Sequence, residues 1–261
     1  MKNLFNVIVI GLSLLVSFLF YYLVMGDPSR FVTEAKHTPL DPSDVLAMVY
    51  TGGPIVALLI SFIIIAATFT IERFLSISKA QGKGNPETFI KKIIDTLAKG
   101  DLETALAECD KQRGTVANIM RSAITRFKDV ENDQEFIAEK KISEVQRAID
   151  EQMNLETPLL EKNLVILSTI ASVAVLFGLL GTTLGMIRAF QALALSGTVS
   201  ATQLSLGISE ALYNTAGGLI GAILAILAYN FFTNKVDGFV YLIDEGILSV
   251  TQIFTGRIKK D

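Results

Sequence analysis

Residues 203–233 read QLSLGISEALYNTAGGLIGAILAILAYNFFT, and this stretch decides the fold of the chain. The run is apolar, is long enough to cross a bilayer as a helix, and contains one acidic residue, Glu210. An ionisable side chain is unfavourable in hydrocarbon unless it is paired, protonated or hydrated, so a spanning helix that keeps one is a candidate functional site. The sequence therefore predicts an all-α membrane protein in which Glu210 has a functional role.

Small and polar residues accompany Glu210 on the expected helix. Glu210 shares one face with Asn214 and, further along, with Gly217, Gly218 and Gly221. A second set of small residues recurs at spacings of four and three: Ala211, Thr215, Gly218, Ala222 and Ala225. Small residues let helix backbones approach closely in lipid, so helix packing is one interpretation of this surface. Packing does not account for the carboxylate, and we predict that Glu210 faces a helix-lined pathway.

The charged residues are segregated along the chain. Hydrophobic residues make up 51% of the sequence, and 15 of the 23 basic and 17 of the 26 acidic residues lie between Glu72 and Asn163. This pattern predicts a polytopic helical bundle with a polar domain inserted between its spans. A net charge of −3 gives no indication of a nucleic-acid partner. Cys109 and His37 are the only residues of their kinds, which excludes an intrachain disulfide and a Cys/His metal site, and we expect no cofactor.

Four apolar segments, separated by polar ones, define the expected domains. Leu4 to Met25 has no cleavage pattern before Gly26, so we expect a retained span. The other parts follow in order: a proline-rich outer loop over 26–47 that contains a solvated His37, a second span over 48–71 with a Gly52-Gly53-Pro54 break, a polar helical domain over 72–163, two further spans joined by a short uncharged loop over 164–233, and an amphipathic helix over 234–261.

Basic residues indicate the orientation of these spans. Lys2 precedes the first span, and Arg73, Lys79 and Lys83 follow the second. The positive-inside rule then places both termini and the polar domain in the cytoplasm. Within the polar domain, apolar residues recur at helical spacing and charges are nearly balanced, which favours a scaffold over an anion-binding surface. Cys109 lies on such a helix, and we interpret it as a packing residue.

The third span contains its own stripe of small residues. Gly178, Gly181 and Gly185 form a GxxGxxxG pattern that is typical of helix packing. Thr182 adds a hydroxyl that can bond a carbonyl, a neighbouring helix or water. Arg188 marks the outer end, where we expect it to reach the interface or to meet an acidic partner.

Two motifs on the last two spans resemble a known family. They are GLLGT at 178–182 with GMIRAF at 185–190, and ISEALYNTAGGL at 208–219 with Tyr229-Asn230 closing the span. Together they resemble the paired signatures of the MotA/TolQ/ExbB proton-channel family, and the resemblance is nearest to its ExbB branch. Weaker similarity extends it to roughly Gly52–Asn230.

This resemblance implies a homo-pentamer in the bacterial inner membrane, with the last two spans of each copy lining a central pore. The pore would enclose single-span helices of an ExbD-like partner whose membrane aspartate carries the proton. The pore threonines of the family fall on Thr182 and Thr215, and its pore glutamate falls on Glu210. Proton flow would turn one subunit ring relative to the other and drive work at the outer membrane through a TonB-like protein.

The sequence departs from the ExbB pattern at three points. Val175 in the third span and Leu224 or a neighbour in the fourth replace the usual prolines. Asn214 occupies a position that is usually small and apolar, and we expect it to line the pathway one turn from Glu210. The span before Gly26 is extra, and it gives the four-span layout of MotA.

Several functions are compatible with these residues. We favour an ExbB-like subunit of a proton-driven motor, with a TolQ- or MotA-like stator as the alternative within the family. A secondary transporter is less favoured because the sequence shows no internal inverted repeat. In a membrane scaffold without ion flow, Glu210 would pair with Arg188 or with a partner. An enzyme is least favoured, because Glu210 has no paired carboxylate, metal ligand set or nucleophile near it in sequence.

Overall fold

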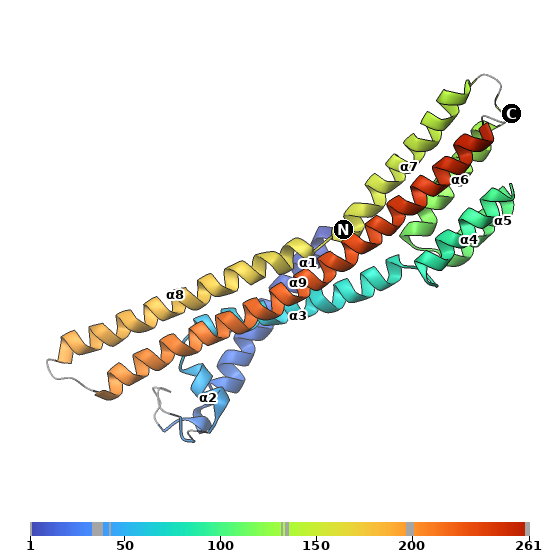
Figure 1. Cartoon of the computed structure of the whole chain (residues 1–261). Coiled ribbons are helices and arrows are strands. Elements are labelled where there is room, and N and C mark those ends of the chain that lie inside the picture. The colour runs from blue at the N-terminus through green and yellow to red at the C-terminus, as the bar shows by residue number, and fades with distance from the viewer. Residues whose placement is uncertain are drawn as a thin grey trace. The chain divides into compact units, whose positions relative to one another are not determined.

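A computed structural model describes residues 2–32, 39–41, 43–131, 133, 136–196 and 201–258. These residues form helices and no strand, with one isolated bridge between Phe31 and Pro39, so the predicted all-α fold is confirmed (Figure 1). The chain divides into two compact units. The apolar unit comprises Met1–Ile71 and Val165–Asn230, and the polar unit comprises Glu72–Leu164 and Phe231–Asp261.

Four helices are long and apolar enough to cross a membrane, as predicted. The apolar segments lie in Leu4–Met25, Ile55–Ala80, Ala138–Gln191 and Leu204–Ile258. Many of their leucines are exposed: Leu212 is 63% and Leu227 is 62% accessible. Contiguous exposed apolar surface of this kind is expected where side chains face lipid.

The first span packs tightly within the apolar unit. Helix α1, Lys2–Leu19, continues as the π-helical segment η1, Phe20–Met25. Tyr21 and Met25 are buried with Val56 and Ala57 in one apolar cluster. The hydroxyl of Tyr21 donates to the carbonyl of Tyr50 at 3.1 Å, and the two rings stack at 4.5 Å. These contacts fix the first span against the start of the second.

The second span differs from the predicted range of 48–71. A 3-10 turn η2, Pro28–Arg30, and a short helix α2, Val45–Tyr50, precede it, and helix α3 runs over Ile55–Ala80. The interruption falls at the Gly-Gly-Pro sequence, where Gly53 has a φ of +80° that side-chain-bearing residues rarely adopt. Helix α3 continues past the charged Glu72, because nothing in the sequence breaks a helix there before Gly82.

The helices that contain the last two spans also extend beyond the ranges predicted for those spans. Helix α8 covers Leu164–Ser196, and helix α9 covers Ala201–Ile258. The residues predicted as an amphipathic helix over 234–261 are helical as far as Ile258 and belong to α9, so no new helix begins at 234. No glycine or proline lies between Thr233 and Val236, and the apolar spacing continues across that point, so the backbone has no reason to leave the helix.

The polar unit contains the amphipathic helices that the spacing predicted: α4, Pro86–Ala98; α5, Leu102–Gln112; α6, Thr115–Glu131; and α7, Ala138–Glu161. The side chains of Asn85 and Asp101 accept hydrogen bonds from backbone amides at the starts of α4 and α5, at 2.9 Å each. The core is built from large apolar side chains, and the ring of Phe127 stacks on that of Phe254 in α9 at 4.0 Å.

A buried arginine of the polar unit lies at the end of α7. Arg73 is 2% exposed, pairs with Glu72 at 2.6 Å and donates to the carbonyl oxygen of Leu160 at 3.2 Å. Glu72 also accepts a hydrogen bond from Asn163 at 3.1 Å. A cation near the last carbonyls of a helix stabilises that end, and its ion pair compensates for burial.

Parts of the expected loops lie outside the described residues. They are residues 33–38, with His37, and residue 42 in the loop over 26–47, residues 197–200 between α8 and α9, and residues 259–261 at the end. The expectations stated for them remain predictions.

Candidate functional site

Helices α8 and α9 touch through their backbones in the apolar unit. A Cβ atom placed on Gly218 would lie 2.6 Å from the carbonyl oxygen of Ala174, and one on Gly178 would lie 3.1 Å from the Cα of Gly218. A Cβ on Gly185 would meet the backbone nitrogen of Ala211 at 2.9 Å. Gly178, Gly185 and Gly218 therefore set the distance between the two helices.

The other predicted packing glycines have different neighbours. Gly217 faces Leu59 and Gly221 faces Ile63, both on α3, with the nearest side-chain atoms 3.2 and 3.5 Å from a Cβ placed on each glycine. Gly181 faces the side chain of Asn214. The six glycines thus serve two helix contacts, α8 with α9 and α9 with α3.

Two threonine hydroxyls meet within this seam. Thr182 on α8 and Thr215 on α9 are hydrogen-bonded to each other. The carbonyl oxygen of Ala211 lies 3.3 Å from Thr182 Oγ1 and 3.2 Å from Thr215 Oγ1. A hydroxyl has one proton and two acceptor lone pairs, so either threonine can donate to the other while the second donates to a carbonyl. The pair can therefore reverse its direction without a change in helix position.

Glu210 lies one turn of α9 before Asn214 and forms an ion pair with Arg188 of α8. The Glu210 side chain is only 13% exposed, whereas that of Arg188 is 54% exposed. Arg188 thus meets an acidic partner, which is one of the two outcomes that the sequence allowed. The backbone of Gly53 lies against this pair, because a Cβ there would be 3.0 Å from Glu210 Oε1 and 3.4 Å from Arg188 Nη1. The sequence predicts a helix break at Gly52 and Gly53 but not this contact with the ion pair.

Asn214 is completely buried within its own chain. Its Nδ2 donates to the carbonyl oxygen of Gly52 at 2.7 Å, and its Oδ1 accepts no hydrogen bond from the described residues. The structure therefore brings Asn214 together with the Gly-Gly turn. The role of lining a pathway, which the sequence suggested for Asn214, stays a prediction.

The polar unit offers no comparable chemistry in the part of the chain that is described. Burial raises the pKa of the Cys109 thiol to about 12, and the neighbouring Asp110 adds to the effect, so the thiol is a packing group at neutral pH. No group of three or more potential metal-ligating side chains occurs among the described residues.

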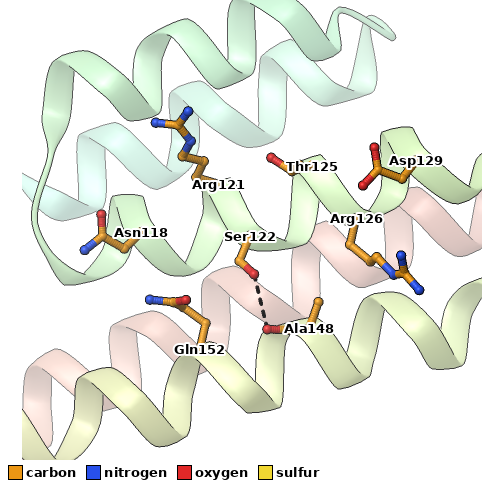
Figure 2. Close-up of a pocket in the computed structure, with 8 residues that line it drawn as sticks. All are labelled: Asn118, Arg121, Ser122, Thr125, Arg126, Asp129, Ala148 and Gln152. Carbon is orange, nitrogen blue, oxygen red and sulfur yellow. Dashed lines mark hydrogen bonds between the residues drawn. The ribbon is translucent and has the colours of Figure 1, made fainter.

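A surface hollow of about 430 Å³ lies between α6 and α7 (Figure 2). Its two arginines already pair with acids, Arg121 with Asp110 and Arg126 with Glu144. Ser122 in its floor donates to the carbonyl oxygen of Ala148 at 3.3 Å. The two arginines and Ser122 therefore already have partners, and the hollow gives no indication of a ligand.

Fold and site together define a class: a multi-pass helical membrane protein with hydroxyl and ionisable groups at a seam between two spanning helices. The chain belongs to the MotA/TolQ/ExbB proton channel family, whose profile matches residues 111–245. This match covers α6, α7 and α8 and most of α9. The family is defined by proton conduction and is not an enzyme class.

Individual relatives carry two different names. The chain is 41% identical over 115 residues to the Tol-Pal system protein TolQ of Haemophilus influenzae, covering 43% of this chain and 48% of that protein. It is 43% identical over 77 residues to the biopolymer transport protein ExbB of Aquifex aeolicus, covering 30% and 52%. A putative ExbB homolog of Methanothermobacter thermautotrophicus is 28% identical over 193 residues, covering 74% and 64%. The chain thus spans about half the length of most of these curated relatives.

Proposed function

We propose that this chain is an ExbB-like subunit of a motor that is driven by the proton-motive force in a bacterial inner membrane. With an ExbD-like single-span partner it conducts protons, and through a TonB-like protein it energises transport across the outer membrane. The observation that carries the proposal is the contact between Thr182 and Thr215 on α8 and α9, with Glu210 1.4 turns away on the same pair of helices. Similarity to relatives named biopolymer transport protein ExbB supports the ExbB-like assignment.

Physical chemistry requires a partner for this function. One carboxylate cannot relay a proton across about 30 Å of hydrocarbon, so a second ionisable group has to come from another chain. The two hydroxyls supply donors and acceptors that can reverse direction beside such a group. We therefore propose a pentamer whose α8 and α9 helices enclose the partner's helix, with Thr182, Glu210 and Thr215 on the pathway.

We extend the proposal to topology. The positive-inside rule, applied to Lys2, Arg73, Lys79 and Lys83, supports a cytoplasmic location of both termini and of the polar unit, with the loop over 26–47 in the periplasm. The polar unit, with its near balance of charge and its apolar core, would serve as the scaffold that holds neighbouring copies together.

Two alternatives each have an observation in their favour. One relative that is 41% identical over 115 residues is a TolQ, which favours a TolQ-like stator for envelope integrity, and the four spans match the layout of MotA. The ion pair between Arg188 and Glu210 favours a scaffold without ion flow, because a paired carboxylate can be structural.

Proton uptake by liposomes that contain this chain and its ExbD-like partner tests the proposal. We expect Glu210→Gln and Thr215→Val to lower uptake at least about tenfold, the scale expected when a group that relays protons is lost. Thr68→Val is the matched control, since among the described residues the Thr68 hydroxyl bonds only the carbonyl oxygen of Ile64 within α3, at 2.8 Å.

Assembly of each variant is checked first by native mass spectrometry of the complex. Equal uptake by assembled native and variant complexes would refute the pathway assignment. Loss of assembly in Glu210→Gln, together with no proton uptake by assembled native complexes, would favour the scaffold without ion flow.

A further inference from the structure

The turn between α2 and α3 lies directly on the Arg188–Glu210 ion pair. Gly52 and Gly53 form this turn, in which their backbone amides donate to the carbonyl oxygens of Val49 and Tyr50 at 3.0 and 3.1 Å. At Gly53 any side chain would be strained by the φ of +80° and would also approach Glu210 Oε1 to 3.0 Å. The bare backbone of Gly53 therefore lies against the Glu210 carboxylate.

Asn214 binds the same turn from the next turn of α9. Residues four apart lie on one face of a helix, so Glu210 and Asn214 both point at the two glycines. Glu210 only touches Gly53, whereas Asn214 donates a 2.7 Å hydrogen bond to the carbonyl oxygen of Gly52. Among the described residues, this hydrogen bond joins a side chain of α9 to the turn.

The packing around Gly181 leaves room for the amide side chain of Asn214. Asn214 is 0% exposed, and its Cγ would lie 2.5 Å from a Cβ on Gly181, so only glycine at 181 leaves room for it. An apolar side chain would fill such a site without the desolvation that an amide incurs. Within the described chain the Asn214 amide makes one hydrogen bond, through Nδ2, and this bond is what distinguishes the amide from an apolar filler.

We propose that Asn214 is a positioning residue, which fastens the Gly52–Gly53 turn onto α9 so that the turn covers the Arg188–Glu210 pair. We call the hydrogen bond from Asn214 to the carbonyl oxygen of Gly52 the latch. When this bond breaks, the Glu210 carboxylate is uncovered on the side of the turn, and when the bond forms, the turn shields the carboxylate. The latch itself is independent of proton flow, but its effect on proton access to Glu210 rests on the proposed function.

Hydrogen exchange of the assembled complex in lipid nanodiscs tests the latch. Loss of one neutral hydrogen bond predicts roughly 2- to 10-fold faster exchange of the amides of Gly52, Gly53 and residues 55–57 in Asn214→Ala. Asn214→Asp keeps the shape beside Gly181 but replaces the amide donor by a carboxyl group, which donates only when protonated. Burial disfavours the ionised form of this carboxyl group, so we expect its exchange to exceed that of the native chain toward alkaline pH and to return toward the native rate on acidification, compared at equal pH. A purely packing role predicts no such recovery.

The matched control is Ser61→Ala. Ser61 is also fully buried, but its hydroxyl bonds the carbonyl oxygen of Leu58 within α3 at 2.6 Å and links no two helices. We expect the turn to exchange at the native rate in this variant. In parallel, modification of Glu210 by a hydrophobic carbodiimide, read residue by residue by mass spectrometry, should be faster in Asn214→Ala than in the native chain and unchanged in Ser61→Ala.

Each result decides a different step. Unchanged exchange of the turn in Asn214→Ala, or exchange that rises equally in Ser61→Ala, overturns the latch. Faster exchange with unchanged modification of Glu210 overturns the claim that the turn covers the carboxylate. If Asn214→Ala does not assemble, the acid recovery of Asn214→Asp still decides. Absence of proton uptake by assembled native complexes refutes the proposed function and leaves the exchange result on the latch unaffected.

Discussion

The core of the polar unit is filled by large side chains, whereas α8 and α9 of the apolar unit meet through glycine and alanine. Phe127, Ile119 and Ile124 are completely buried in the polar unit. In the apolar unit the carbonyl oxygen of Ala174 lies so close to Gly218 that no side chain fits there. Added side-chain volume should therefore destabilise the contact of α8 with α9 in the apolar unit, and lost side-chain volume should destabilise the polar unit.

The physical reason for this difference is the solvent around each unit. In water the removal of apolar area drives packing, and large side chains remove the most. Lipid gives helices no hydrophobic drive to associate, so contact depends on dispersion and on close backbone approach. Large apolar side chains such as Leu176 and Leu179 accordingly remain exposed on α8, at 61% and 58%.

The largest effect is expected for Phe127→Ala in the polar unit. The ring is 0% exposed and stacks on Phe254, so truncation should leave a cavity and lower the free energy of unfolding by about 3–5 kcal/mol. Native-state hydrogen exchange of α6 amides measures this loss, and exchange of α8 amides shows whether it stays within the polar unit. Leu155→Ala on α7 is the control, since Leu155 is 66% exposed. Equal losses in the two variants would mean that the polar unit does not depend on its packed core.

A smaller effect is expected for added volume at Gly218. We expect Gly218→Ala to destabilise the contact of α8 with α9 by roughly 1–3 kcal/mol, because the new methyl group meets backbone atoms that cannot move alone. Gly238 lies on the same helix with nothing within 4 Å of a Cβ, so Gly238→Ala should stabilise by about 0.5–1 kcal/mol through its higher helix propensity. Thermal unfolding of both variants in one detergent compares them. If both variants raised or both lowered the melting temperature, added volume would not distinguish the apolar unit from the polar unit.

The sequence predicted the features that depend on local pattern. Uninterrupted apolar runs predicted the four spans, and helical spacing around Ile93, Ile119 and Val145 predicted the helices of the polar unit. The GxxGxxxG pattern of the third span indicated close packing but could not say which glycine faces which helix. That assignment, such as Gly217 on Leu59, depends on the rotation of each helix about its axis.

The remaining features of the site depend on contacts between distant segments. Asn214 and Gly52 are 162 positions apart, and no periodicity relates them. Positive φ at Gly53 could have been suspected from Gly-Gly-Pro, which is a turn signal, but its contact with Glu210 could not. The pairing of Arg188 with Glu210 was one of the possibilities that the charges allowed, and geometry selects it in the isolated chain.

The smallest effect is expected where the polar unit relies on surface charge. Hydrogen bonds from Lys111 and Lys92 hold the pKa of Glu108 below its ordinary value, at 2.7 and 2.6 Å. A carboxyl group whose pKa is lower in the folded chain stabilises at neutral pH, and this contribution is lost as the pH falls through the folded pKa. Because the two lysines are 71% and 56% exposed, solvent screens the pairs, and Glu108→Gln should leave the melting temperature at pH 7 almost unchanged. We also expect a slight loss of stability on acidification in the native chain, and this loss should be absent from the variant. A decrease in melting temperature at pH 7 as large as that of Phe127→Ala would mean that charge rather than volume holds the polar unit together.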